Sequence, residues 1–128
     1  MHKSFLVWAA LLGGLAVILG AFGAHKLKEL VPMETVSTFQ TGVTYQFYHV
    51  FALLAVGILY AHIPVAQLVW AGRFFLIGIL LFSGSLYALT LLKATETVGL
   101  RGIGAITPLG GLFFIAGWVA LLLGVLRK

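Results

Sequence analysis

Hydrophobic residues gather in four long runs, and short polar or glycine-rich stretches separate them. The runs cover residues 5–24, 42–61, 65–92 and 108–126. A helix needs about 20 apolar residues to cross the hydrocarbon core of a bilayer, so each run predicts a transmembrane helix. The helices and their connections leave no room for a soluble domain. The pattern therefore predicts one membrane domain over residues 1–128, an all-α integral membrane protein built as a bundle of four transmembrane helices.

A short amphipathic pattern lies between the first two runs. Pro32 suits the first position of a helix, and Glu34 places a favourable negative charge in its first turn. Apolar residues then recur at three- and four-residue spacing, as expected for one helix face. The pattern predicts a short amphipathic helix over residues 32–41 that lies at the membrane interface. Gly42 is the predicted bend into the second transmembrane helix.

The last helix has a predicted start at Thr107 and Pro108, after a glycine-rich loop over residues 93–106. Thr107 has the residue type of an N-cap, and proline is favoured at the first helical position. Two helices carry ridges of small residues that permit close helix approach. The ridges are Ala16, Gly20 and Ala24 in the first helix, and Ala116, Ala120 and Gly124 in the last. They suit either a contact within one chain or a contact between subunits.

Composition agrees with a membrane protein, since 62% of residues are hydrophobic and only 9% are charged. The first run exceeds the length of a signal-peptide core, so we interpret it as a retained helix. Four helices place both termini on one side. Lysines and arginines divide evenly between the two sides, and the free N-terminal amine favours termini in the cytoplasm. The net charge of +5 comes from residues at helix ends, which indicates contact with lipid headgroups and no nucleic-acid partner.

Hydrogen-bonding side chains concentrate at the start of the second helix, in the sequence QTGVTYQFYH at residues 40–49. Thr41, Tyr45 and His49 share one helix face at four-residue spacing. Gln46 borders this face, and Gln40 precedes it. The sequence therefore takes a polar helix face, with an ionisable histidine on it, into the bilayer.

The other helices bring polar residues to the same side of the membrane. Ser83, Ser85 and Tyr87 lie near the end of the third helix, and Ser85 and Tyr87 lie at a depth close to that of His49. His25 follows the first helix, and Thr107 begins the last. The sequence thus predicts that polar groups from all four helices converge in one half of the membrane.

Two interpretations of this cluster follow. Polar residues in a bilayer are costly unless they are paired or hydrated, and an ionisable group there is a functional candidate. The same side chains can simply hydrogen-bond one helix to the next. Their gathering in one half favours a polar pocket that opens to the side opposite the termini. Arg101, with the free amides that follow Thr107, is a candidate site for an anionic headgroup there.

Three functions compete for such a pocket. The first is a non-enzymatic protein that holds a lipid or another amphiphile, with membrane lipids as its partners. The second is a proton-linked transporter or channel, since histidine relays protons, and this needs a homo-oligomer because four helices are few for a pore. The third is a haem or metal bound by His25 and His49, or an enzyme site. No cysteine nucleophile exists and no acidic residue orients His49, so the residues favour no enzyme and no cofactor.

Four segments resemble, in this order, a family of small bacterial inner-membrane proteins. They are GAFGAHKLKEL, FQTGVTYQFYHVFALLAVG, LFSGSLYALTLL and ITPLGGLFFIAGW. The family is catalogued as domain of unknown function 423 and is related to the eukaryotic transmembrane protein 256. The resemblance covers nearly the whole chain. It implies a four-helix protein of the bacterial cytoplasmic (inner) membrane with no established biochemical activity.

Overall fold

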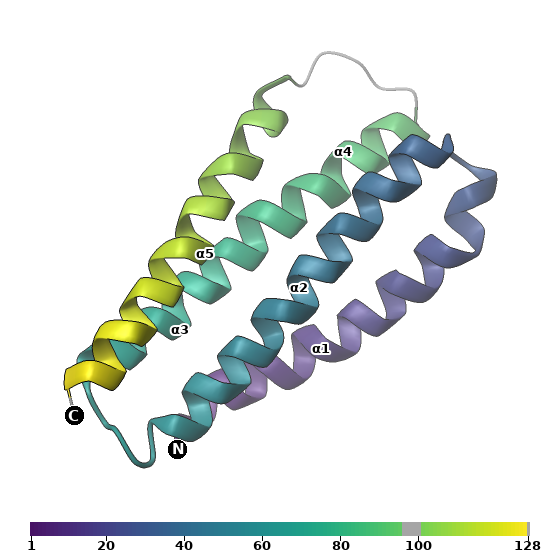
Figure 1. Cartoon of the computed structure of the whole chain (residues 1–128). Coiled ribbons are helices and arrows are strands. Elements are labelled where there is room, and N and C mark those ends of the chain that lie inside the picture. The colour runs from purple at the N-terminus through teal and green to yellow at the C-terminus, as the bar shows by residue number, and fades with distance from the viewer. Residues whose placement is uncertain (96–100, 128) are drawn as a thin grey trace.

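The structure is a computed structural model that describes residues 1–95 and 101–127. The described residues form helices joined by short connections and contain no strand. The helices are α1 (Lys3–Ala24), η1 (Lys26–Glu29), α2 (Met33–Leu59), α3 (Ala66–Gly78), η2 (Ile79–Ser83), α4 (Gly84–Ala94) and α5 (Arg101–Arg127). Among these residues four segments are long and apolar enough to cross a membrane. The predicted all-α membrane fold with four spans is therefore confirmed, and both termini lie at one end of the molecule (Figure 1).

The spans lie side by side in chain order. α1 packs on α2, α2 packs on α3, η2 and α4, and these three pack on α5. α1 and α5 lie on opposite sides of the molecule (Figure 1). Of the two contacts that the small-residue ridges left open, the one between the first and last helices within one chain is therefore not formed, and a contact between subunits stays untested. Ala16 is buried where α1 packs on α2, and Ala120 is buried where α5 packs on α3. Each ridge therefore packs against the neighbouring span in the sequence.

The second span differs from its prediction. Residues 32–41 do not form a separate interfacial helix, because α2 runs unbroken from Met33 to Leu59. Its 27 residues extend about 40 Å, so its ends project beyond a hydrocarbon core of about 30 Å. Gly42 is not a bend. A Cβ at Gly42 would lie 2.9 Å from the Tyr87 ring, so this glycine lets α4 approach α2 closely.

The pairing of α1 with α2 sets the depth of the polar residues. Gly13 lies against Val50 and Gly20 against Val43, so the two helices run antiparallel in constant register. The centre of the apolar run at residues 5–24 therefore lies opposite residues 48 and 49. The bilayer centre thus falls near His49, and residue 39 lies near the hydrocarbon edge on the side opposite the termini.

The third span is one helical column that contains a π-helical segment. α3 continues through η2 into α4 over residues 66–94. Periodicity predicts the column but not η2. Gly110 of α5 approaches the Phe82 backbone so closely that a Cβ there would lie 2.3 Å from the Phe82 nitrogen. The π segment thus coincides with a close backbone approach of two spans. Such segments are frequent at functional sites.

The last span begins earlier than predicted. α5 starts at Arg101, so residues 101–106 are helical and the predicted loop over residues 93–106 is too long. Pro108 lies inside the helix and Thr107 is not its N-cap. Proline is tolerated within membrane helices because neighbouring helices and local adjustments satisfy the freed backbone groups. The predicted headgroup site on free amides after Thr107 is therefore wrong, since those amides are not in a first turn.

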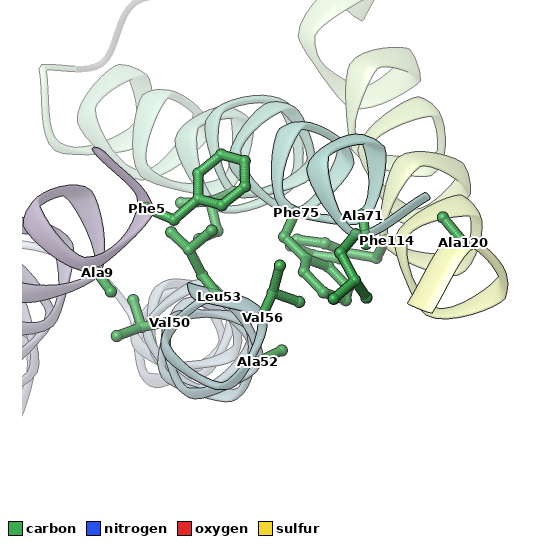
Figure 2. Close-up of a cluster of buried hydrophobic side chains, with 12 residues drawn as sticks. Phe5, Ala9, Val50, Ala52, Leu53, Val56, Ala71, Phe75, Phe114 and Ala120 are labelled. Atoms are coloured by element: carbon green, nitrogen blue, oxygen red, sulfur yellow. The ribbon is translucent and has the colours of Figure 1, made fainter. Parts of the chain in front are cut away.

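The core at the terminal end is built from phenylalanine rings set against glycines. A Cβ at Gly72 would lie 2.2 Å from the Phe5 ring, at Gly117 2.6 Å from Phe75, and at Gly78 2.3 Å from Phe114. These rings are almost fully buried with the aliphatic side chains around them. Figure 2 shows Phe75 and Phe114 together beside Ala71, with Phe5 reaching across from α1. Because glycine has no side chain, each ring can pack directly on the neighbouring helix. Close packing of this kind drives helix association in lipid.

Candidate functional site

Gln46 makes two hydrogen bonds to other spans within the bilayer. Its side chain is 1% exposed. The Tyr87 hydroxyl donates to Gln46 Oε1 at 2.6 Å, and Gln46 Nε2 donates to the Leu12 carbonyl at 2.8 Å. These bonds join α1, α2 and α4. An unpaired amide in hydrocarbon costs roughly several kcal/mol. The hydrogen bonds of Gln46 and Tyr87 therefore fix the relative positions of these three helices.

His49 forms a second polar contact on the other side of α2. Its Nδ1 lies 2.8 Å from the Tyr45 carbonyl, and Trp118 Nε1 donates to its Nε2 at 3.1 Å. A carbonyl only accepts and an indole N–H only donates, so the network assigns neutral His49 with its proton on Nδ1. The ring stacks on Phe114 with 3.5 Å between centroids. Both ring nitrogens are therefore occupied, and neither is free to bind a metal or pass a proton in this arrangement.

The predicted serines join neighbouring helices. Ser83 Oγ donates to the Gly42 carbonyl at 2.7 Å and is fully buried. Ser85 Oγ donates to the Phe82 carbonyl at 2.8 Å and lies 2.5 Å from Thr107 Oγ1. The first contact ties η2 to α2, and the second ties α4 to α5. Thr107 thus has a side-chain partner on another helix.

The remaining residues of the predicted cluster do not converge with these pairs. Gln40 Nε2 donates to the Gly20 carbonyl at 3.4 Å, and Thr41 Oγ1 donates to the Ser37 carbonyl at 3.0 Å on an exposed surface. Tyr45 is 40% exposed, and its hydroxyl has no hydrogen-bond partner among the described residues. The side chain of Arg101 lies outside the described part of the structure.

The two histidines proposed as metal or haem ligands do not meet. His25 is exposed and caps the end of α1. Gly23 packs on Gln40, which is nine residues, or about 13 Å of helix, from His49. The described residues contain no group of three or more histidine, cysteine, aspartate or glutamate side chains able to hold a metal. The structure therefore separates the pair that the sequence offered for metal binding.

An apolar groove with a volume of about 500 Å³ is lined by residues of three spans. It lies between α1 and the α3–η2–α4 column, and Gln46 and Tyr87 border it. Its lining is Trp8, Leu12, Leu15, Gln46, Leu76, Ile79, Leu80, Gly84 and Tyr87. We call this cavity the α1 groove. A Cβ at Gly84 would meet nothing within 4 Å, so the groove is open at this glycine.

The α1 groove begins in the half of the membrane near the termini and ends at Gln46 and Tyr87, which belong to the predicted pocket. Leu15 is at the bilayer centre, and Trp8 is about 10 Å nearer the termini. The hydrogen bonds of Gln46 draw α1, α2 and α4 together, while Phe5 closes on Gly72 at the terminal end. Space remains between these two contacts. Sequence periodicity does not reveal this groove, since its α1 lining is a plain apolar face.

A second, more aromatic groove of about 410 Å³ lies between α2 and α5. Tyr45, His49, Phe82, Phe114 and Trp118 contribute to its walls. Trp118 is not among the site residues that the sequence predicts. Its partner His49 was found through its position in the bilayer, but only the packing of α5 shows which indole reaches it.

Comparison with known proteins places the chain in a family. Residues 19–111 match the family described as protein of unknown function (DUF423). The UPF0382 membrane protein SSP2132 of Staphylococcus saprophyticus is 41% identical over 125 residues, which cover 98% of each chain. The UPF0382 inner membrane protein YgdD of Escherichia coli K12 is 38% identical over 125 residues, 98% of this chain and 91% of the relative. No solved structure matches.

These relatives confirm the prediction of a multi-pass protein of the bacterial inner membrane, together with the four spans of the structure. The orientation of the termini stays a prediction. The family match covers well over half of the chain, and the relatives cover nearly all of it. The chain belongs to the UPF0382 (DUF423) family of membrane proteins of unknown function.

Proposed function

We propose that this protein is a non-enzymatic membrane protein that binds an acyl chain of a membrane lipid in the α1 groove. The observation that carries the proposal is the groove itself. Its volume of about 500 Å³ is within the roughly 300–1,000 Å³ usual for ligand sites. Apolar side chains of α1, α3 and η2 make up most of its wall, so the chemistry suits a hydrocarbon chain.

The polar residues shape this site in the proposal and do not hold a headgroup. Gln46 and Tyr87 are hydrogen-bonded to each other, and Gln46 also donates to the Leu12 carbonyl. The two side chains therefore set the spacing of α1 from α4 and end the groove beyond the bilayer centre. An acyl chain would enter past Trp8 from the leaflet on the terminal side and end at this pair.

The competing functions gain no support from the geometry of His49. A proton relay or an axial haem ligand needs a free imidazole nitrogen, and both nitrogens of His49 are engaged. A planar aromatic stack on Phe114 and the bond from Trp118 hold the ring in place. We therefore do not extend the proposal to proton transport or to a haem site.

The test fills the groove without disturbing the fold. Gly84→Leu puts a side chain into open space, and leucine is about 1 kcal/mol better than glycine in a helix. The matched control is Gly14→Leu, since Gly14 also has nothing within 4 Å but faces the lipid outside the groove. Each protein is reconstituted in nanodiscs that contain phospholipid with a photoactivatable acyl chain, and cross-linked peptides are identified by mass spectrometry.

We expect the wild type and Gly14→Leu to cross-link at the α3 and α1 residues of the groove, and Gly84→Leu to lose most of this signal. Helical content and thermal stability of both variants should match or exceed those of the wild type. Equal cross-linking of the groove peptides in Gly84→Leu and Gly14→Leu would rule out a bound chain there.

A further inference from the structure

A small charged pocket lies at the other end of the molecule, between the first turns of α2 and the last turns of α4. Its volume is about 240 Å³, and Glu34, Thr35, Thr38, Thr90 and Lys93 line it together with Pro32 and Leu89. Residue 39 lies near the hydrocarbon edge, so Glu34 is about 8 Å further out. This depth is the headgroup layer of the leaflet opposite the termini. The pocket shares no residue with the α1 groove.

Backbone amides at the start of α2 provide free donors to this pocket. Pro32 is the N-cap, and its side chain cannot accept a hydrogen bond. The Pro32 carbonyl accepts from the amides of Thr35 at 3.0 Å and Val36 at 3.1 Å. The amides of Met33 and Glu34 have no partner among the described residues. Two such amides, with the positive end of the helix dipole, favour a bound anion such as a phosphate.

Thr35 supplies an independent sign of a ligand. Its side chain is only 9% exposed and lines the pocket, yet its hydroxyl has no hydrogen-bond partner among the described residues. The neighbouring threonines behave differently. Thr38 Oγ1 donates to the Glu34 carbonyl at 3.2 Å, and Thr90 Oγ1 donates to the Leu86 carbonyl at 2.9 Å. No described residue pairs with the Thr35 hydroxyl, so it is a free donor in the wall of this pocket.

The pocket also holds two opposite charges that are not paired with each other. Glu34 and Lys93 both line it, but the one ion pair among the side chains that the structure describes joins Lys26 to Glu29 at 3.2 Å. A pocket for a simple anion would not gain from Glu34. A ligand that carries both a phosphate and an ammonium group would match the two charges and the free amides together.

We propose that this pocket binds the headgroup of a zwitterionic phospholipid whose phosphate ester bears a primary amine. The phosphate oxygens accept hydrogen bonds from the Met33 and Glu34 amides, the Thr35 hydroxyl and Lys93. The ammonium group of the same headgroup pairs with the Glu34 carboxylate. This site serves the opposite leaflet from the α1 groove and does not depend on a chain being bound there.

The experiment uses the full chain in nanodiscs made from equal parts of phosphatidylethanolamine, phosphatidylglycerol and phosphatidylcholine. Lipids retained after release are counted by native mass spectrometry. We expect the wild type to retain phosphatidylethanolamine over both others. Lys93→Gln should lower its retention at least about tenfold, because the variant loses a charge-assisted hydrogen bond to phosphate. Lys28→Gln, which removes an exposed lysine elsewhere on that side, should leave retention unchanged.

Two further variants separate the two parts of the headgroup. Glu34→Gln should remove the preference for phosphatidylethanolamine over phosphatidylglycerol, while Thr35→Val should weaken retention of both.

The proposal fails if Lys93→Gln and Lys28→Gln give the same lipid profile, or if the wild type retains the three lipids equally. It also fails if Glu34→Gln lowers thermal stability but leaves the lipid preference intact, since Glu34 would then serve only the dipole of α2. Neither result bears on the α1 groove, because Gly84→Leu tests that groove through different residues and a different signal.

Discussion

The two halves of this protein hold their helices together in different ways. In the half near the termini, rings of Phe5, Phe75 and Phe114 fill the spaces over glycines of the neighbouring helices. Beyond the bilayer centre, hydrogen bonds such as those of Gln46 and Ser83 connect the spans. The comparison matters because lipid offers no hydrophobic force between helices. Packing and hydrogen bonding are the two means that remain, and side-chain hydrogen bonds between spans concentrate in the half opposite the termini.

The two halves also differ in how they leave space. Ring-into-glycine contacts close the terminal end, and amide and hydroxyl bonds close the level of Gln46. The α1 groove lies between these two closures. Polar residues in this protein therefore shape a cavity by fixing helix spacing, even though they contribute little to its wall.

The largest expected loss of stability comes from a substitution in the half near the termini, where rings pack on glycines. In Gly117→Ala, the new Cβ lies 2.6 Å from the ring of Phe75, which is fully buried and has no room to move. Overpacking of this kind costs about 2 kcal/mol in the free energy of unfolding. Unfolding in mixed detergent micelles measures it. Gly111→Ala is the control on the same helix, since its nearest neighbour is 4.0 Å away. Equal stability of the two variants would contradict this close packing.

A smaller effect is expected in the hydrogen-bonded half. Gln46→Leu removes two interhelical bonds, and such bonds average about 0.6 kcal/mol each, so unfolding should become easier by about 1 kcal/mol. Gln67→Leu is the control near the terminal end, because Gln67 Oε1 is buried without a partner among the described residues. Removal of that unpaired group should leave stability unchanged or raise it by up to about 1 kcal/mol. The same loss in both variants would show that the bonds of Gln46 carry no special weight.

The smallest effect concerns Ser83. In Ser83→Ala the Gly42 carbonyl loses the bond of 2.7 Å from Ser83 but keeps its place in the backbone of α2. We expect a loss of about 0.6 kcal/mol, measured by the same unfolding assay. Ser37→Ala, at an exposed position, should give no change. A loss above the roughly 1.7 kcal/mol seen for the strongest such bonds would mean that Ser83 also supports η2.

Much of the fold can be predicted from the sequence, and the predictions that are wrong have a common cause. The apolar runs predict all four spans. Gly42 and Pro108 predict a bend and a helix start by local propensity, yet both lie inside unbroken helices. In a membrane every backbone group must find a partner, so helices extend through residues that would end them in water. Tertiary contacts then use these residues for close approach.

The candidate site shows the same division. The sequence identifies Gln46, His49 and Tyr87 as costly polar groups in the bilayer, because their cost depends only on residue type and depth. It does not reveal that Gln46 pairs with Tyr87 while His49 pairs with Trp118. Those partners lie 41 and 69 residues away along the chain. Their pairing depends on which helix faces which.

The sequence by itself determines the membrane as solvent, the four spans, the shared side of the termini and the polar residues that need partners. Each of these depends on hydropathy and length, which are properties of single segments. Only the tertiary structure decides the order of the helices across the molecule, the pairs that satisfy the polar groups and the place of the α1 groove. These depend on contacts between segments, where small residues and hydrogen bonds select one arrangement among several that the same hydropathy allows.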